Sequence, residues 1–248
     1  MDVERPSRRT VLTLVAVAVL SVLLDLALGA VRIVRTDGGR GWGTTESVPL
    51  PAPSDDGDLP VEAAIADRRS RREYADRALD RRELGQLLWA AQGVTERSSG
   101  FRAAPSAGAL YPLELYVVVG TPGVSDLDGG VYRYRPGPHD LVPGESGDVQ
   151  PELRAAAVDQ AFVGAAAIDV VVCAVDERTT GKYGERGRRR YVPMEAGHAG
   201  QNLYLQAESL GLATVSVGAF DDDRVRELVG APADRRPLYV FPVGGRRR

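Results

Sequence analysis

An apolar stretch extends from Val11 to Val31 and is interrupted by a single charged residue, Asp25. A helix of about 20 apolar residues spans the hydrocarbon core of a bilayer, so this stretch is long enough to cross a membrane. Arg8 and Arg9 precede it, as in a twin-arginine export signal. Residues 1–35 are therefore predicted to direct the chain to a membrane, either as an export signal or as a single-pass anchor. We expect the protein to be membrane-associated or exported, with its folded domain outside the cytoplasm.

Residues 36–60 lack any periodic arrangement of apolar positions and are rich in Gly, Pro, Ser and Asp. Such a composition is typical of a linker. Three alternating glycines at 39, 41 and 43 are similar to a nucleotide-binding loop, but no strand pattern precedes them and no helix pattern follows. The sequence therefore predicts a linker over 36–60 and one folded domain over 61–248.

Five segments of that domain have the apolar periodicity or the end signals of helices. Asp80 and Glu83 form a predicted capping box for one of them, and Gly93 ends it. Gly211 closes the longest of the five. The predicted helices are Val61–Arg69, Arg81–Gln92, Pro151–Phe162, Met194–Leu210 and Asp222–Val229.

The predicted strands lie between these helices. Leu115–Val119 and Ile168–Val175 are continuous apolar runs rich in valine, which is typical of strands buried on both faces. Gly130–Tyr134 alternates as an exposed strand would, and Val215–Val217 and Leu238–Val243 complete the set. Thr179–Arg190 is predicted to be a polar loop. Helices and strands interleaved in this way indicate an α+β fold around one sheet.

The formal net charge of −3 gives no electrostatic reason to expect a nucleic acid as a partner. Cys173 is the one cysteine of the chain, so no intrachain disulfide can form. His139 and His198 are its two histidines and are far apart in sequence, so no metal site is expected. The chemistry must then come from an organic cofactor or from oxygen and nitrogen side chains.

Three segments carry candidate chemistry. Arg68, Arg69, Ser70 and Arg72 cluster at a predicted helix end, where guanidinium groups and a hydroxyl suit a phosphate, although a solvated basic helix end gives the same pattern. The second segment is a proline-bracketed run of small residues over 104–112, which suits either a stiff loop beside a flat ligand or a tight turn. The third is the start of the long helix, where Gly197 and Gly200 each cost about 1 kcal/mol relative to alanine and so indicate close packing.

In this order, the three segments resemble the nitroreductase superfamily, and in particular its SagB-type azoline dehydrogenases. The similarity covers residues 61–248 and includes Gly130–Tyr134, Gln160 and Ile168–Val175. It implies an α+β fold with a central, mostly antiparallel sheet flanked by helices. It also implies non-covalently bound FMN and a homodimer with the flavin at the subunit interface.

The resemblance also implies roles for individual residues. Arg68, Ser70 and Arg72, with the neighbouring Arg69, would hold the FMN phosphate, and Arg246 near the C-terminus would complete that site. The isoalloxazine ring would be lined from the other subunit by Pro105, Ser106, Ala107 and Ala109. Val217 and Gly218 would present their backbone to the central edge of the flavin. Gly197 and Gly200 would allow close helix packing in the dimer.

Lys182 and Tyr183 are the remaining candidates. Lys182 is the one lysine of the chain, and the resemblance associates such a pair with proton removal, although exposed loop lysines are common. The predicted function is an FMN-dependent oxidoreductase that transfers hydride by a ping-pong scheme to or from a small or peptide-derived substrate. Two alternatives stay open: an NAD(P)H-dependent reductase of nitro compounds or quinones, and a non-catalytic, membrane-tethered flavin-binding domain.

Overall fold

The computed structural model describes Trp42 and residues 46–247. The predicted membrane-directing segment, including Arg8, Arg9 and Val11–Val31, lies outside the described residues, as does the first part of the predicted linker. Within Trp42 and 46–247, no helix is both long enough and apolar enough to cross a membrane.

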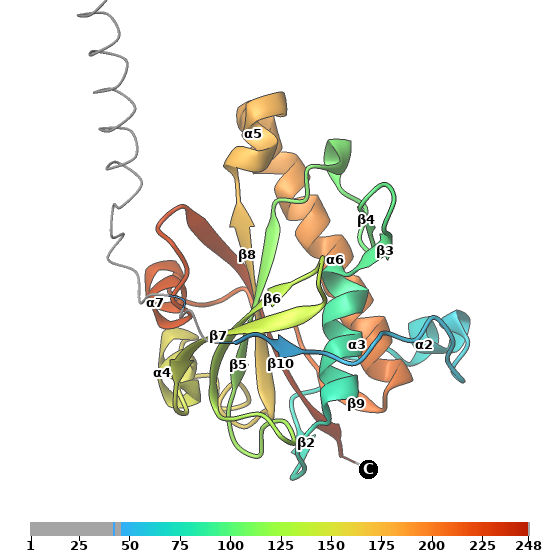
Figure 1. Cartoon of the computed structure of the whole chain (residues 1–248). Coiled ribbons are helices and arrows are strands. Elements are labelled where there is room, and N and C mark those ends of the chain that lie inside the picture. The colour runs from blue at the N-terminus through green and yellow to red at the C-terminus, as the bar shows by residue number, and fades with distance from the viewer. Residues whose placement is uncertain (1–41, 43–45, 248) are drawn as a thin grey trace, which may run out of the picture. The chain divides into compact units, whose positions relative to one another are not determined.

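An antiparallel sheet forms the centre of the domain (Figure 1). Within the described residues it has eight strands, in the order β1-β7-β6-β5-β8-β10-β2, and β9 pairs with β10 beside this path. The strands are β1 Val48–Pro49, β2 Tyr74–Ala75, β5 Leu113–Val119, β6 Gly130–Arg135, β7 Asp140–Ser146, β8 Ile168–Val175, β9 Leu212–Thr214 and β10 Arg235–Arg246. A separate hairpin joins β3 Val94–Glu96 to β4 Phe101–Arg102.

Helices cover both faces of this sheet (Figure 1). The helices α3 Arg81–Gln92 and α6 Val192–Ser209 pack on one face, and α4 Gln150–Ala156 and α7 Asp222–Leu228 pack on the other. Successive residues of a strand point to opposite faces, so Val170 and Val172 of β8 join the α3–α6 core while Val171 and Cys173 join the α4–α7 core. Burial on both faces explains why β5 and β8 are continuous apolar runs.

Several predicted elements are confirmed. Ile168–Val175 is a strand with the predicted limits. The helix α3 has the predicted limits, and its capping box is formed in both directions between Asp80 and Glu83. Such a cap contributes about 1 kcal/mol. The long helix α6 ends before Gly211, which has a φ of 65°. The predicted α+β class with a central antiparallel sheet is also confirmed.

Three local predictions are wrong. Gly130–Tyr134 is not an exposed strand, because β6 lies between β5 and β7 and most of its residues are buried. Val215–Val217 is not a regular strand: β9 ends at Thr214, and the N–H of Ser216 donates to the hydroxyl of Tyr204 instead of to a neighbouring strand. The helix predicted over Pro151–Phe162 ends at Ala156, shortly before the two positive φ angles of Val158 and Asp159.

The predicted loop Thr179–Arg190 is also wrong, since it is largely helical. It contains most of α5 Glu177–Tyr183 and of a π-helical turn, η2 Gly187–Tyr191, which leads into α6. Two further helical elements, α2 Val61–Asp67 and the 3₁₀ turn η1 Ala107–Ala109, lie at the other two candidate segments. Lys182, Tyr183, Ala107 and Ala109 therefore lie in short helical elements, whereas Arg68–Arg72 follow α2 in irregular backbone.

The described part of the predicted linker lies against the domain. Val48 and Pro49 pair with β7, and the N–H of Leu50 donates to the carbonyl of His139 at 3.1 Å. The backbone N–H of Ser54 donates to the side chain of Gln86 on α3 at 2.8 Å. Residues 46–60 are therefore fixed to the edge of the sheet and to α3.

The two glycines at the start of α6 differ in their surroundings. A Cβ on Gly200 would lie 2.8 Å from Cζ of Phe241 on β10, whereas a Cβ on Gly197 would meet nothing within 4 Å. Gly200 thus allows α6 to approach the sheet of its own chain closely, and Gly197 is exposed.

Candidate functional site

The predicted site residues form two groups near opposite ends of α6 (Figure 1). We call the group near its C-terminal end the tyrosine cluster: Arg68, Ser70, Tyr204 and Ser216. The group near its N-terminal end is the loop cluster: Ser106, Gly108, Lys182, Tyr183 and Glu195. Glu195 and Tyr204 are nine residues apart on α6, which corresponds to about 14 Å along the helix axis at ~1.5 Å per residue.

The hydroxyl of Tyr204 is the centre of the tyrosine cluster. It lies 3.0 Å from Oγ of Ser70 and accepts the backbone N–H of Ser216 at 2.8 Å. The Arg68 guanidinium lies 5.1 Å from the centre of the Tyr204 ring. One buried side chain therefore joins the chain after α2 to the segment that follows β9.

Glu208, one turn further along α6, joins the chain after α2 to the end of β10. Its buried carboxylate forms ion pairs with Arg71 at 3.3 Å and with Arg246 of β10 at 3.1 Å. It also accepts the backbone N–H of Arg69 at 3.3 Å. The side chain of Arg69 donates to the carbonyls of Ala66 and Arg68. Arg69 and Arg246 are thus engaged within the protein, on the two sides of the cluster.

Arg68 and Arg72 are different, because neither has a carboxylate partner within the described residues. The Arg72 guanidinium lies 5.5 Å from the centre of the Phe162 ring. Nearby, Val217 is buried and bridges to Val240, and Gly218 is exposed, so that a Cβ added to it would meet no atom within 4 Å. Gln160 donates to the carbonyl of Ala219 at 3.1 Å and so fixes the backbone beyond Gly218.

The loop cluster is built on the η1 turn. The hydroxyl of Ser106 accepts the backbone N–H of Tyr111 at 2.9 Å and closes the turn. Ala109 and Tyr111 have positive φ angles of 53° and 46°, a conformation that is strained for residues with a side chain. Pro105 and Ala109 are exposed, and Ser106 and Ala107 are half-buried.

Lys182 and Tyr183 of α5 lie against this turn. A Cβ on Gly108 would be 2.8 Å from the hydroxyl of Tyr183 and 3.0 Å from Nζ of Lys182. The two side chains also contact each other, with Nζ 5.4 Å from the centre of the Tyr183 ring. The structure therefore brings together two segments that lie more than 70 residues apart in the sequence.

Glu195 lies beneath the same turn and is 2% exposed. Burial raises the pKa of Glu195 to about 7, and the nearby Ser106, Arg102 and Gln92 partly oppose this shift. Its Oε1 atom has no hydrogen-bond partner within the described residues. The loop cluster thus holds a buried acid that can exchange a proton near neutral pH.

Tyr204, Ser216, Glu208 and Glu195 were not predicted as site residues. One signal was available for Tyr204, since a tyrosine in the buried stripe of a helix must find a partner for its hydroxyl. Glu208 offers a similar signal, because a buried carboxylate is expected to be paired.

The comparison with known families and proteins gives a consistent result. The sequence model of the nitroreductase family matches residues 65–245. The nitroreductase-family protein MJ1384 of Methanocaldococcus jannaschii is 46% identical over 202 residues, which is 82% of this chain and 98% of that protein. The crystal structure of a nitroreductase-family protein from Ralstonia eutropha superposes with a TM-score of 0.70 at 28% identity, covering 83% of this chain and 92% of the other.

A third relative is the microcin B17-processing protein McbC of Escherichia coli. It is 30% identical over 165 residues, which is 64% of this chain and 60% of McbC. A chain of the E. coli microcin synthetase McbBCD complex, solved with truncated pro-MccB17 bound, superposes with a TM-score of 0.63 at 25% identity, covering 84% of this chain and 80% of that chain. The resemblance to the nitroreductase superfamily inferred from the three sequence segments is therefore confirmed, and McbC is one of the proteins to which the chain is similar.

Proposed function

This chain belongs to the nitroreductase family, and from that premise we propose that it is an FMN-dependent oxidoreductase. The observation that carries the proposal is the tyrosine cluster, which joins Arg68 and Ser70 to the backbone before Val217 through one buried hydroxyl. A flavin needs a phosphate site and a polar backbone edge at a fixed separation. Arg68 and Ser70 would supply the first, and the backbone of Val217 and Gly218 would supply the second.

The residues of the tyrosine cluster suit a phosphate group. Arg68 and Arg72 form no ion pair with a carboxylate within the described residues, so their charges are available for an anion. Arg71 and Arg246, in contrast, are bound to Glu208. We therefore propose that Arg68, Ser70 and Arg72 hold the FMN phosphate. In this proposal, Arg246 orders the site through Glu208.

The position of the loop cluster supports a homodimer. Pro105, Ser106, Ala107 and Ala109 lie near the opposite end of α6 from the tyrosine cluster. We propose that these residues line the ring of a flavin held by the partner subunit, while Val217 and Gly218 present backbone to its central edge. The site would then be complete only in the dimer.

FMN, when bound, accepts or donates a hydride. The residues of this chain would hold it, exclude water and move the accompanying proton. We propose that Lys182 and Tyr183 bind that proton at Nζ or at the phenol oxygen, because both atoms lie against Gly108 of the loop that would line the ring. The strained η1 turn would fix their position.

The McbC relative favours a dehydrogenase that oxidises a peptide-derived substrate, since its complex was solved with a peptide bound. We further propose that the domain works outside the cytoplasm, where NAD(P)H is scarce, and this also favours oxidation of a substrate over reduction by a nicotinamide. A reductase of nitro compounds or quinones is the second candidate, and the name of the MJ1384 relative favours it.

A flavin spectrum of the full-length protein tests the cofactor first. We expect bound FMN, and we expect R68A and S70A each to weaken FMN binding roughly tenfold or more, because each removes a hydrogen bond to a charged group. The matched control is R82A, which removes an exposed arginine of α3. Protein without flavin under reconstituting conditions would contradict the enzyme proposal and also the alternative of a non-catalytic flavin-binding domain.

Reduction of the bound flavin then separates the candidate reactions. Bleaching by an azoline peptide and not by NAD(P)H would support the dehydrogenase, and the reverse result would support the reductase. K182Q and Y183F should retain FMN and lose at least about 100-fold in the rate of flavin reduction by the substrate. Unchanged rates in both variants would exclude this pair as the proton acceptor.

A further inference from the structure

The sheet opens between two of its central strands, β5 and β6. Their pairing runs from Val119–Gly130 to Tyr116–Arg133 and stops there, although both strands continue. Leu113, Glu114 and Leu115 pair onward with β8, and Tyr134 and Arg135 pair onward with β7. Neighbouring central strands that separate in this way leave a wedge-shaped gap in the sheet.

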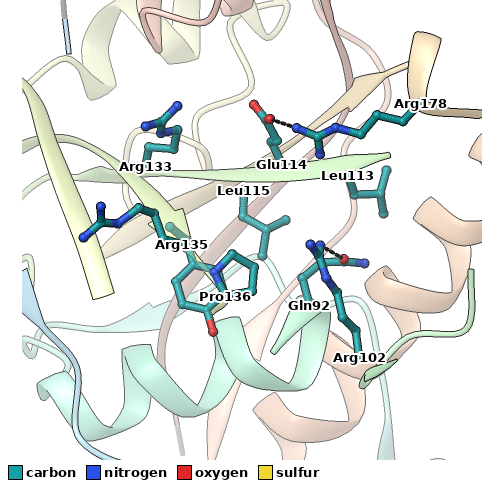
Figure 2. A pocket seen from close by; sticks show the side chains of 10 residues that line it. Gln92, Arg102, Leu113, Glu114, Leu115, Arg133, Arg135, Pro136 and Arg178 are labelled. Atoms are coloured by element: carbon teal, nitrogen blue, oxygen red, sulfur yellow. Dashed lines mark hydrogen bonds and ion pairs between the residues drawn. The ribbon is translucent and has the colours of Figure 1, made fainter. Parts of the chain in front are cut away.

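A pocket of about 200 Å³ occupies this gap. At ~30 Å³ per water molecule it has room for about seven waters, or for one functional group of a larger molecule. Leu113 and Leu115 line it from β5 and Pro136 lines it from the end of β6. Figure 2 shows Gln92 and Arg102 reaching toward these strands from one side, with Arg178 joined to Glu114 nearby.

The polar groups of this pocket are mostly donors. Gln92 is completely buried, and its Nε2 atom has no hydrogen-bond partner within the described residues. Its Oε1 atom accepts from Nη1 of Arg102 at 2.9 Å, so the amide holds the guanidinium in place. The Arg102 guanidinium also lies 4.6 Å from the centre of the Tyr111 ring. Two planar donor groups are thus fixed side by side.

Some of the arginines that line the pocket have their charge neutralised by an ion pair with a carboxylate, and others do not. Arg178 is paired with Glu114, and Arg135 is paired with Asp140. Arg102 has no carboxylate within ion-pair distance among the described residues. Burial and then repulsion from Arg178 lower its pKa, and the nearby carboxyl of Glu195 partly opposes this shift. Arg133 also lacks such a partner, but in Figure 2 it is directed away from Gln92 and Arg102. On this side of the gap Arg102 is therefore not neutralised by an ion pair, and the buried carboxyl of Glu195 lies near it.

We propose that this pocket binds a carboxylate group, held by the guanidinium of Arg102 and the amide N–H of Gln92. A planar guanidinium matches the two oxygens of a carboxylate, and no ion pair within the described residues occupies that of Arg102. The size of the pocket limits the ligand to a small organic acid or to one acidic group of a larger molecule. None of these residues is proposed to hold FMN, so the inference stands apart from the proposed function.

A titration of the full-length protein with propionate tests this assignment. Arginine side-chain NMR signals should show saturable shifts at Arg102 with propionate and none with propionamide, which has nearly the same shape and no charge. R102Q should weaken binding about tenfold or more. Q92E should abolish it, because it places a competing carboxylate beside Arg102. R97Q, an equal charge change in the exposed β3–β4 turn, should leave binding unchanged.

R102K keeps the charge but loses the planar fork, so it should bind more weakly than the wild type even if R102Q does not fold. Equal binding of propionamide would overturn the proposal, as would propionate binding that Q92E and R102K leave unchanged. Preferential binding of inorganic phosphate over propionate would overturn the assignment to a carboxylate. Because the titration follows protein signals, it gives the same answer in flavin-free protein.

Discussion

The tyrosine cluster and the loop cluster are held by the same helix but are built differently. In the tyrosine cluster the central hydroxyl is paired, because Tyr204 bonds Ser70 and Ser216, and beside the cluster Glu208 bonds two arginines, although Nε of Arg71 has no partner among the described residues. In the loop cluster, Oε1 of Glu195 and the nearby Nε2 of Gln92 have no partner among the described residues. The turn above them includes two non-glycine residues with positive φ.

This difference suggests that one cluster binds a group and the other reacts with one. A hydrogen-bond network whose central groups are paired is rigid and suits a group that stays bound, such as a cofactor phosphate. Unpaired buried groups and backbone strain are stabilised by the rest of the fold and are concentrated where a protein does chemistry. The comparison predicts that variants in the tyrosine cluster change stability and flavin retention, whereas variants in the loop cluster change pH dependence and turnover.

The largest expected effect is the loss of the buried carboxylate at 208. E208A leaves Arg71 and Arg246 without their partner and frees the N–H of Arg69, so we expect a loss of about 3 kcal/mol in the free energy of unfolding. FMN retention should fall as well, because Arg71 and Arg69 adjoin Arg68 and Ser70. Chemical denaturation and the bound-flavin content measure the two effects. D55A, at an exposed acid, should change neither; a similar loss in D55A would contradict the special role of Glu208.

The second prediction concerns pH and the loop cluster. Burial raises the pKa of Glu195 to about 7, so the folded protein holds this proton more tightly than the unfolded chain. The stabilisation is complete below the unfolded pKa near 4.5 and is lost as the pH rises through 7. The glutamine side chain of E195Q stays neutral, so the free energy of unfolding of E195Q should rise relative to that of the wild type between pH 5 and 8. The expected rise is up to about 3 kcal/mol, at ~1.4 kcal/mol per pKa unit.

Denaturation curves of both proteins at several pH values measure this difference. Asp169 is fully buried and its pKa is also raised, so the wild type alone would not isolate Glu195. The difference in the free energy of unfolding between wild type and E195Q isolates the contribution of Glu195. A difference that does not change between pH 5 and 8 would show that Glu195 ionises normally and that the loop cluster lacks the expected buried acid.

The sequence predicted the elements with strong local signals. The capping box of α3 and the two-sided apolar run of β8 are local patterns, and both were placed correctly. The helix α5 was missed because Thr179–Arg190 is polar and glycine-containing, so it shows no apolar stripe. Its contacts with η2 and with the Gly108 turn stabilise it instead.

The candidate site was predictable in parts and not as a whole. The three segments were recognisable because their residue types are specific in that order. Their connections were not, because Ser70 and Tyr204 are 134 residues apart and meet only in the folded chain. The unpaired state of Glu195 depends likewise on which side chains surround it. Composition and spacing carry no information on either.

A third prediction tests whether the loop cluster positions reacting groups. Gly108 has a φ of 66°, and a Cβ there would contact Lys182 and Tyr183. G108A should therefore lose about 1 kcal/mol of stability through its backbone and, by displacing the two side chains, roughly 10- to 100-fold in turnover. The matched control is G100A, which has a φ of 70° and no atom within 4 Å of the added Cβ. It should lose similar stability and no activity. Equal turnover in G108A and the wild type would remove the positioning role.

The smallest expected effect distinguishes the free face of α6 from a subunit interface. Gly197 lies two residues after Glu195, and a Cβ at this position would meet nothing within 4 Å in the protomer. If solvent covered this face, G197A would stabilise α6 by about 0.5–1 kcal/mol, since alanine favours a helix over glycine. In the proposed homodimer, a partner packs closely here, so G197A should weaken dimerisation instead. Analytical ultracentrifugation of the full-length protein measures this, and G181A on α5, which also meets open space, is the control. A dimer as tight as the wild type, with added stability, would place the interface elsewhere and leave the loop cluster without a partner flavin.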